Sequence, residues 1–216
     1  MKKASVILAL LAAGFPVNLP AKSLADLRIG NAGLGFQYTG SVETRAQSGD
    51  QSRDSSTSLG GITFSLRKQG FRFLNDHARF AWDTSLLISP YSLGLENPSG
   101  SGEWMLRGSL FNLRTGPSVE FPIAGEWLLR VHAGIDAGYV ATRLRATGSN
   151  SSGSGEWLFG YHAEGALLFS PHRNITFFAG GGFENLGTQE ITQSSDRALI
   201  DLSSNLILST GMIFPW

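Results

Sequence analysis

Apolar and polar residues alternate along most of the chain with the period of two that is typical of β-strands. The pattern is clearest from residue 204 onward. There, every second position is apolar or small and uncharged, and the positions between them are mostly polar or tiny. The first set is Ser204, Leu206, Leu208, Thr210, Met212, Phe214 and Trp216. The sequence therefore predicts a final strand with two unlike faces that ends on an aromatic residue.

Seven further segments between residues 31 and 184 alternate in the same way. The first covers residues 31–44, and the others centre on residues 62–67, 80–88, 111–121, 129–139, 157–169 and 175–184. Stretches rich in Gly, Ser, Pro and Asn separate them, as turns and loops do. The pattern predicts an all-β fold of about eight strands.

The connections between these segments alternate in length. Polar connections of about thirteen residues cover 45–57, 90–102, 143–155 and 185–197, and connections of about five to ten residues lie between them. Transmembrane β-barrels have short turns on one side of the membrane and longer loops outside. A soluble β-sandwich has no reason to sort its connections in this way, so the pattern favours a membrane barrel.

The first 25 residues have the features of a secretory signal peptide. Lys2 and Lys3 precede an apolar stretch at 6–15, and small residues at Ala21 and Ala25 offer cleavage sites. A buried first helix is the alternative, but prolines at 16 and 20 would break it. We expect residues 1–25 to be a signal peptide and residues 26–216 to form a single barrel domain.

With its final alternating strand ending in Phe214, Pro215 and Trp216, the chain resembles the small eight-stranded bacterial outer-membrane β-barrels of the OmpA/OmpX-like family. This resemblance implies an eight-stranded up-and-down antiparallel transmembrane β-barrel in the cell outer membrane, without a periplasmic domain. It also implies that the barrel assembly machinery recognises the final strand, and that outer-membrane lipid and lipopolysaccharide surround the barrel. We expect a monomer in which the final strand closes against residues 31–44.

Aromatic residues lie mostly near the ends of the segments, as the girdles of membrane barrels require. They are Trp82, Trp104, Trp127, Trp157, Tyr139, Tyr161, Phe121, Phe169 and Trp216. One stretch departs from the pattern, because Trp104, Leu106 and Leu110 alternate in the phase opposite to that of Phe111 and its successors. Either a β-bulge near Leu110 or an extension of the strand above the membrane would explain it.

Composition narrows the classes of function. The formal net charge is zero and only 16% of residues are charged, which argues against a nucleic-acid-binding surface. The chain has no cysteine, so disulfides, thiolate metal sites and cysteine nucleophiles are excluded. No apolar run of about eighteen residues follows the amino terminus, which excludes a helical membrane protein.

The face opposite the apolar one carries charged residues and two histidines. They are Glu43, Arg67, Asp83, Arg114, Glu120, Arg130, Asp136, Glu164, Glu184, His132 and His162. The interior of an eight-stranded barrel is just wide enough for side chains to fill, and charges buried there must pair. A hairpin turn centred near Ala124 would set Arg130 diagonal to Glu120 and Asp136 diagonal to Arg114, so we predict these two ion pairs.

Candidate catalytic residues are few. The resemblance implies one possible chemistry, because the enzymes known among eight-stranded outer-membrane barrels modify lipid A with a Ser, a His and an acid. His77 and His172 fall in predicted periplasmic connections, and His162 is followed by Ala163 and Glu164 instead of by a serine two residues later. We interpret His132, His162, Asp136 and Glu164 as a structural polar network. We expect no catalytic, cofactor-binding or metal-binding residue.

The sequence therefore predicts a structural or surface-interaction protein with a filled polar interior and no open pore. Two alternatives come from other classes of function. One is a lipid A-modifying outer-membrane enzyme of the same fold, and the other is a soluble exported β-barrel that binds an apolar ligand.

Overall fold

The computed structural model describes residues 28–74, 77–100, 102–146 and 152–215. Within them the chain forms ten β-strands, and no helix there is long and apolar enough to cross a membrane. The strands are β1 (Arg28–Ser48), β2 (Gln51–Phe73), β3 (Ala78–Glu96), β4 (Glu103–Ala124), β5 (Trp127–Arg145), β6 (Ser152–His172), β7 (Ile175–Asn185), β8 (Thr188–Gln193), β9 (Asp196–Asp201) and β10 (Asn205–Pro215). The predicted signal peptide and Trp216 lie outside the described residues.

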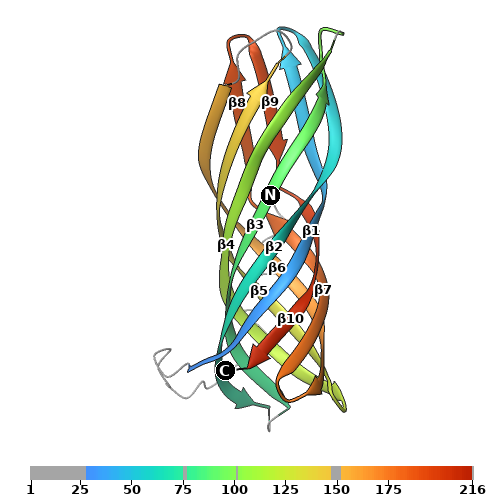
Figure 1. Ribbon diagram of the computed structural model, residues 1–216. Coiled ribbons are helices and arrows are strands. Elements are labelled where there is room, and N and C mark those ends of the chain that lie inside the picture. The colour runs from blue at the N-terminus through green and yellow to red at the C-terminus, as the bar shows by residue number, and fades with distance from the viewer. Residues whose placement is uncertain (1–27, 75–76, 101, 147–151, 216) are drawn as a thin grey trace.

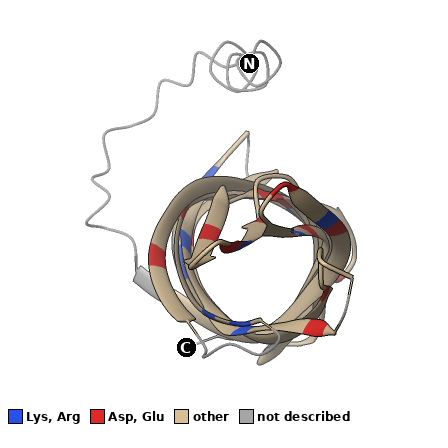
Figure 2. Cartoon of the chain, turned by 90° about the horizontal axis from the view of Figure 1, so that it is seen from above, with Lys and Arg blue, Asp and Glu red and all other residues tan. Residues whose placement is uncertain are grey.

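Eight of these strands form a closed antiparallel ring. β1 to β7 pair in sequence order, and β10 pairs with both β7 and β1 (Figures 1 and 2). The closing ladder runs from the pair Asn31 and Pro215 to the pair Gly40 and Leu206. The structure thus confirms the eight-stranded up-and-down barrel and the closure of the final strand against the first.

Large apolar side chains face outward in a band around the part of the ring that includes β10, which is the lower part in Figure 1. On β5 the band runs from Leu129 to Tyr139 through Val131 and Ile135. At about 3.3 Å per residue and a tilt of about 40°, this stretch rises about 25 Å, the height of the apolar band of outer-membrane barrels. A soluble barrel with an apolar ligand cavity would turn these side chains inward, so the band argues against that alternative.

The turns from β2 to β3, β4 to β5 and β6 to β7 lie at one end of the barrel, and the connections that were predicted to be long lie at the other. Most of each predicted external loop is strand instead, so these loop predictions are mostly wrong. Strand pairing continues through them, so that β1 and β2 are joined only by a turn at Gly49 and Asp50. Gly49 has a φ of +57°, which suits glycine in a tight turn. The polar side chains there do not end the strands, because backbone groups of neighbouring strands still pair and the outward face can meet water.

Above the band the interior is mostly apolar, which corrects the prediction of a polar interior throughout. Trp104, Leu106 and Leu110 point inward in the same phase as Arg114, without a bulge between β3 and β4. The extension above the membrane was therefore the correct interpretation. Trp104 is only 2% exposed and does not belong to the aromatic girdle.

The β8–β9 hairpin closes this upper interior. After β7 the chain turns at Leu186 and Gly187, and β8 packs against β5 and β6 while β9 pairs with the upper part of β1 (Figure 1). The side chains that join the inward-facing residues of β1 to β6 in one apolar cluster are Leu186, Ile191, Ala198, Ile200 and Leu202. We call residues 186–202 the plug. Burial of each large aliphatic side chain contributes about 1.5–3 kcal/mol.

A bulge in β1 corrects the predicted position of Glu43. The β1–β2 register shifts between Thr39 and Val42, and Ser41 has a φ of +59°. Below the bulge Gln37 and Thr39 face the interior, whereas above it Val42 does, so Glu43 points outward. The predicted phase ran straight through this irregularity, because nothing in the apolar pattern marks a single extra residue.

Candidate functional site

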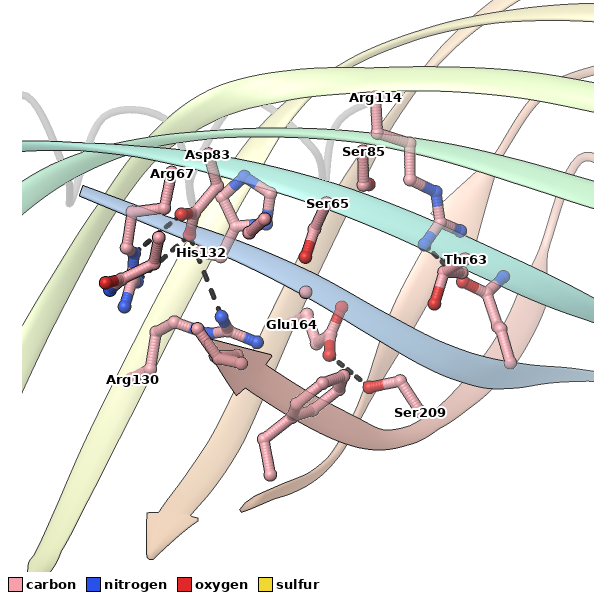
Figure 3. A pocket seen from close by; sticks show the side chains of 16 residues that line it. Thr63, Ser65, Arg67, Asp83, Ser85, Arg114, Arg130, His132, Glu164 and Ser209 are labelled. Carbon is pink, nitrogen blue, oxygen red and sulfur yellow. Dashed lines mark hydrogen bonds and ion pairs between the residues drawn. The ribbon is translucent and has the colours of Figure 1, made fainter. Parts of the chain in front are cut away.

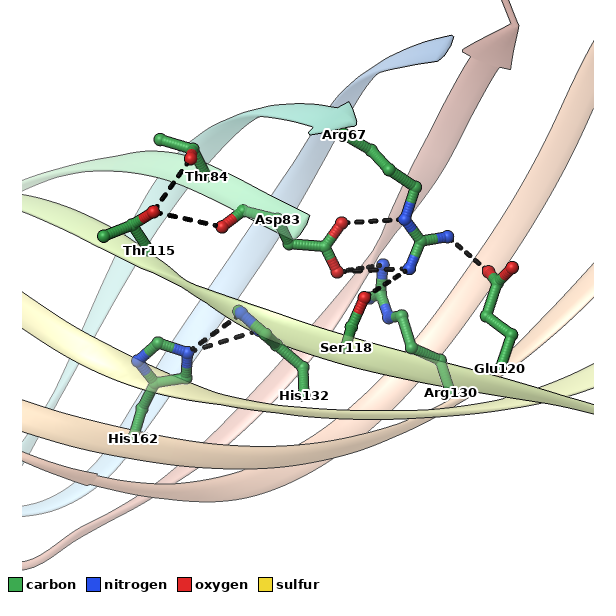
Figure 4. Close-up of polar contacts among 9 residues, drawn as sticks. All are labelled: Arg67, Asp83, Thr84, Thr115, Ser118, Glu120, Arg130, His132 and His162. Atoms are coloured by element: carbon green, nitrogen blue, oxygen red, sulfur yellow. Dashed lines mark hydrogen bonds and ion pairs between the residues drawn. The ribbon is translucent and has the colours of Figure 1, made fainter. Parts of the chain in front are cut away.

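Arg67 organises the lower end of the polar interior. Its Nε and Nη2 donate to the two carboxylate oxygens of Asp83 at 2.7 and 3.1 Å, and Nη2 also donates to the Ser118 hydroxyl at 3.1 Å. Its Nη1 donates to Glu120 (Figure 4). All four residues are buried, so one guanidinium joins β2, β3 and β4 and satisfies two carboxylates.

Arg114 forms a second node higher in the barrel. It donates through Nε to Glu184 on β7, 3.0 Å away across the interior, and through Nη1 to the side-chain oxygen of Gln37. Asn112 donates to the same Glu184 carboxylate at 2.6 Å. Gln37, Asn112 and Ser118 were not named as network members, although each lies in the interior phase and the alternation alone could have identified them.

The two predicted ion pairs do not form. All four side chains point inward as expected, and the register places Arg130 directly opposite Glu120 and Arg114 directly opposite Asp136. These residues are direct register partners, and not diagonal neighbours, because the turn lies at Gly125 and Glu126. Glu120 instead binds Arg67, and the nearest carboxylate oxygen to Arg130 is that of Asp83, at 3.9 Å. A narrow barrel lets side chains meet across the lumen, and strand register alone does not predict such contacts.

Asp136 belongs to a chain of hydrogen bonds with both interior histidines. The Asp136 carboxylate accepts from Nδ1 of His162 at 2.6 Å, and Nε2 of His162 lies 3.2 Å from Nδ1 of His132. With the His162 proton on Nδ1, Nε2 of a neutral ring is an acceptor, so His132 donates to His162. The predicted cluster of His132, His162 and Asp136 is thus brought together, while Glu164 accepts from Ser209 instead.

A small cavity lies beside this network. It has a volume of about 60 Å³, and its lining includes Arg130, His132, Glu164 and Ser209 (Figure 3). Nε of Arg130 has no protein partner among the described residues. A cavity needs roughly 10–15 Å³ of such space to hold one water, so this one has room for a few waters, whereas ligand pockets measure about 300–1,000 Å³.

An Asp–His pair can orient a general base, but nucleophilic catalysis also needs a nucleophile within hydrogen-bond reach. Within the described part of the chain, no serine hydroxyl donates to His132 or His162. No group of three or more His, Asp or Glu side chains there is arranged to hold a metal ion. His77 and His172 lie at the lower rim, where the sequence placed them. The arrangement is suited to holding strands together.

No protein-family model and no curated protein matches the chain. Solved structures do match it. OprG from Pseudomonas aeruginosa superposes with a TM-score of 0.57 at 8% identity, covering 90% of this chain and 99% of OprG. The outer membrane protease OmpT from Escherichia coli superposes with a TM-score of 0.50 at 9% identity, covering 90% of this chain and 99% of OmpT. Neisserial surface protein A reaches a TM-score of 0.46 at 13% identity, covering 86% and 97%.

The chain has the outer-membrane β-barrel fold. The outward apolar band and the shared fold agree on its place in the outer membrane of a Gram-negative cell envelope. The fold does not decide between an enzyme and a protein without catalysis, since OmpT is a protease. The function of this outer-membrane barrel therefore depends on its own residues.

Proposed function

We propose that the protein is a non-conducting outer-membrane barrel without catalytic activity, and that it acts through its outer surface as a structural or surface-interaction protein. The observation that carries the proposal is the plug. Its apolar side chains fill the interior above the membrane, and the Arg67 and Arg114 networks occupy the interior below the plug, within the membrane-spanning part.

The plug is held by polar contacts as well as by apolar packing. Gln189 on β8 donates to the backbone carbonyl of Val140 at 3.0 Å and accepts from the Thr142 hydroxyl at 2.6 Å. The Thr142 hydroxyl also contacts the hydroxyl of Tyr91 on β3. Gln189 is fully buried, so losing these contacts would leave a buried amide unsatisfied. The plug is thus fixed to the wall, which supports a static closure.

The contacts between the plug and the wall also make the surface above the membrane rigid. The hairpins β1–β2, β3–β4 and β5–β6 extend past the apolar band as paired strands, and their inward faces pack on the plug. Their outward faces are polar and carry most of the exposed charge at this end, including Arg45, Asp54 and Arg107. A rigid, water-exposed β-surface of this kind suits binding to another molecule outside the cell.

Conductance measurements test the closed interior. Purified full-length protein inserted into planar bilayers should give no discrete current steps, while its heat-dependent gel shift shows that the barrel is folded. Regular steps of constant size from folded protein would contradict the proposal.

The enzymatic alternative has its own test. We expect the mass spectrum of lipid A from cells that express the protein to equal that from cells without it. A new acylated, deacylated or otherwise modified lipid A species that requires the protein would show that it is an enzyme. A variant with His162→Gln and Asp136→Asn would then tell whether the interior histidine chain is involved.

A further inference from the structure

The outer wall formed by β4, β5 and β6 carries an ordered set of side-chain rows above and across the membrane boundary. The register aligns them from top to bottom as Arg107, Arg143 and Gly153, then Ser109, Ala141 and Gly155, then Phe111, Tyr139 and Trp157. Arg143 lies four residues beyond Tyr139, which is about 10 Å higher along the tilted strand. Basic, small and aromatic rows thus follow one another at the outer boundary of the apolar band.

The basic row consists of two like charges directly opposite each other. Arg107 and Arg143 are Cα partners in the β4–β5 ladder, and both are exposed. Neither has a hydrogen bond or an ion pair with any described residue. Like charges directly opposite on one face of a sheet destabilise it. An anion shared by the two guanidiniums would reverse this effect, because arginine binds phosphate through paired hydrogen bonds.

The small residues below the arginines open a groove of about 500 Å³ on the outer wall. Its lining includes both arginines, Ser109, Ala141, Gly153, Gly155 and Tyr139. A Cβ atom at Gly155 would lie 2.2 Å from the Tyr139 hydroxyl, so only glycine lets the Tyr139 ring lie over the strand there. The groove is far larger than a phosphate ion needs, and it has an aromatic ring in its wall.

Apolar side chains continue below the groove. Phe159 and Ile135 are 74% and 68% exposed, and Trp157, which packs on Tyr139 at 5.2 Å between ring centroids, is 60% exposed. These side chains protrude into the acyl region of the outer leaflet. A ligand that fits the whole surface has a phosphate at the top, a bulky polar group beneath it and hydrocarbon chains at the bottom.

We propose that this wall binds a phosphorylated sugar lipid of the lipid A type from the outer leaflet. Its phosphate lies between Arg107 and Arg143, its sugar occupies the groove beside Tyr139, and its acyl chains lie along Phe159 and Ile135. The proposal rests on the proposed function, because it names a specific ligand for the outer surface through which the protein acts. Binding would survive even if the barrel conducted ions or had an enzymatic activity, so the two proposals can fail separately.

Thermal unfolding of the full-length protein in detergent tests this site, with deep-rough lipopolysaccharide as the probe. A ligand that binds only the folded state raises its stability with concentration. We expect the unfolding temperature to rise with lipopolysaccharide and to change little with the same lipid after removal of its phosphates. Inorganic phosphate at equal concentration should have no effect. Stabilisation by inorganic phosphate as strong as that by the lipid would overturn the assignment to a lipid.

A double variant and a charge-matched control locate the site. Arg107→Ala with Arg143→Ala should weaken the apparent affinity for lipopolysaccharide at least tenfold, and without lipid it should be no less stable than the wild type. Arg45→Ala with Arg53→Ala removes the same charge from the β1–β2 hairpin and should bind as the wild type does. Unchanged binding by the first variant, or equal weakening in both, would overturn the proposal.

Discussion

Arg67 and Asp83 face each other directly across the β2–β3 ladder, and the Arg67 Nε lies 2.7 Å from the Asp83 carboxylate. The same guanidinium donates to Glu120 on β4, so one cation compensates two buried acids. Removing one partner of a buried ion pair is costly, because the remaining charge is left without compensation. Arg67 therefore links three neighbouring strands inside the membrane span (Figure 4).

Replacing Arg67 with alanine should destabilise the folded barrel by about 3–5 kcal/mol, because Asp83 and Glu120 would stay buried without the guanidinium that hydrogen-bonds to both. Urea unfolding in lipid vesicles, followed by tryptophan fluorescence and by the heat-dependent gel shift, measures the change. A loss below about 1 kcal/mol, the value for surface pairs, would show that the network is dispensable.

The exposed pair of Arg45 and Asp54 gives the matched control. The hydrogen bond from Arg45, with an Nε–Oδ1 distance of 2.6 Å, lowers the pKa of Asp54 from its usual value. Solvent screens an exposed pair, so Arg45→Ala should leave the unfolding curve unchanged within error.

The sequence was sufficient to predict the parts of the fold that repeat. Alternation placed Phe159 and Ile135 outside and His162 and Asp136 inside, because a strand side chain has only two directions to choose from. The closing pair of strands followed from the resemblance to outer-membrane barrels, in which the final strand pairs with the first. Alternation did not show which medium each face meets, and for this reason Trp104 and Trp157 were both assigned to one girdle although they lie on opposite sides of the wall.

The remaining errors have a common physical origin. Glu43 was misplaced because one residue with a left-handed backbone reverses every later position in the strand. The partners of Arg114 and Glu120 were misassigned because contacts across the lumen depend on the three-dimensional radius and stagger of the barrel. The plug was missed because residues 188–201 are mostly polar in sequence, so that the hairpin resembles an external loop.

The bulge at Ser41 leads to a second prediction. A non-glycine residue in the left-handed region costs roughly 1–2 kcal/mol, so Ser41→Gly should stabilise the barrel by about 1 kcal/mol. Ser41→Val should destabilise it, because a β-branched side chain fits that conformation poorly. Urea midpoints of the two variants test this, and equal midpoints would argue against the bulge.

Gly160 leads to a third prediction. A Cβ atom there would lie 1.7 Å from the backbone carbonyl oxygen of Asn185, where β7 ends and the chain turns into the plug. Gly160→Ala should therefore displace the start of the plug and lower the unfolding temperature. Gly165→Ala, on the same strand but with no atom within 4 Å of the new Cβ, is the control and should behave as the wild type. Equal stability of the two variants would contradict the close approach of β6 and the plug.

The final strand gives a fourth prediction. Phe214 pairs with Ala32 and Pro215 pairs with Asn31, so these residues complete the seam that closes the ring. Deleting residues 214–216 should strongly reduce the amount of folded protein in the outer membrane, as fractionation and the gel shift report. Removal of Gly49 and Asp50 from an external turn should reduce it much less. Normal assembly after the first deletion would refute a special role for this end.

Cysteine labelling tests most directly whether the upper interior is sealed, because the chain contains no cysteine of its own. Leu144 is buried against the plug, and its neighbour Arg145 is exposed. A second variant lacks residues 187–203, which removes all of the plug except Leu186. This deletion needs only a short turn between β7 and β10, which already pair at Glu184 and Asn205.

On intact cells, a membrane-impermeant maleimide should label Arg145→Cys rapidly and leave Leu144→Cys unlabelled. In the variant without residues 187–203, Leu144→Cys should become reactive. Labelling of Leu144→Cys as fast as Arg145→Cys in the otherwise unchanged protein would show that the upper interior is open to water.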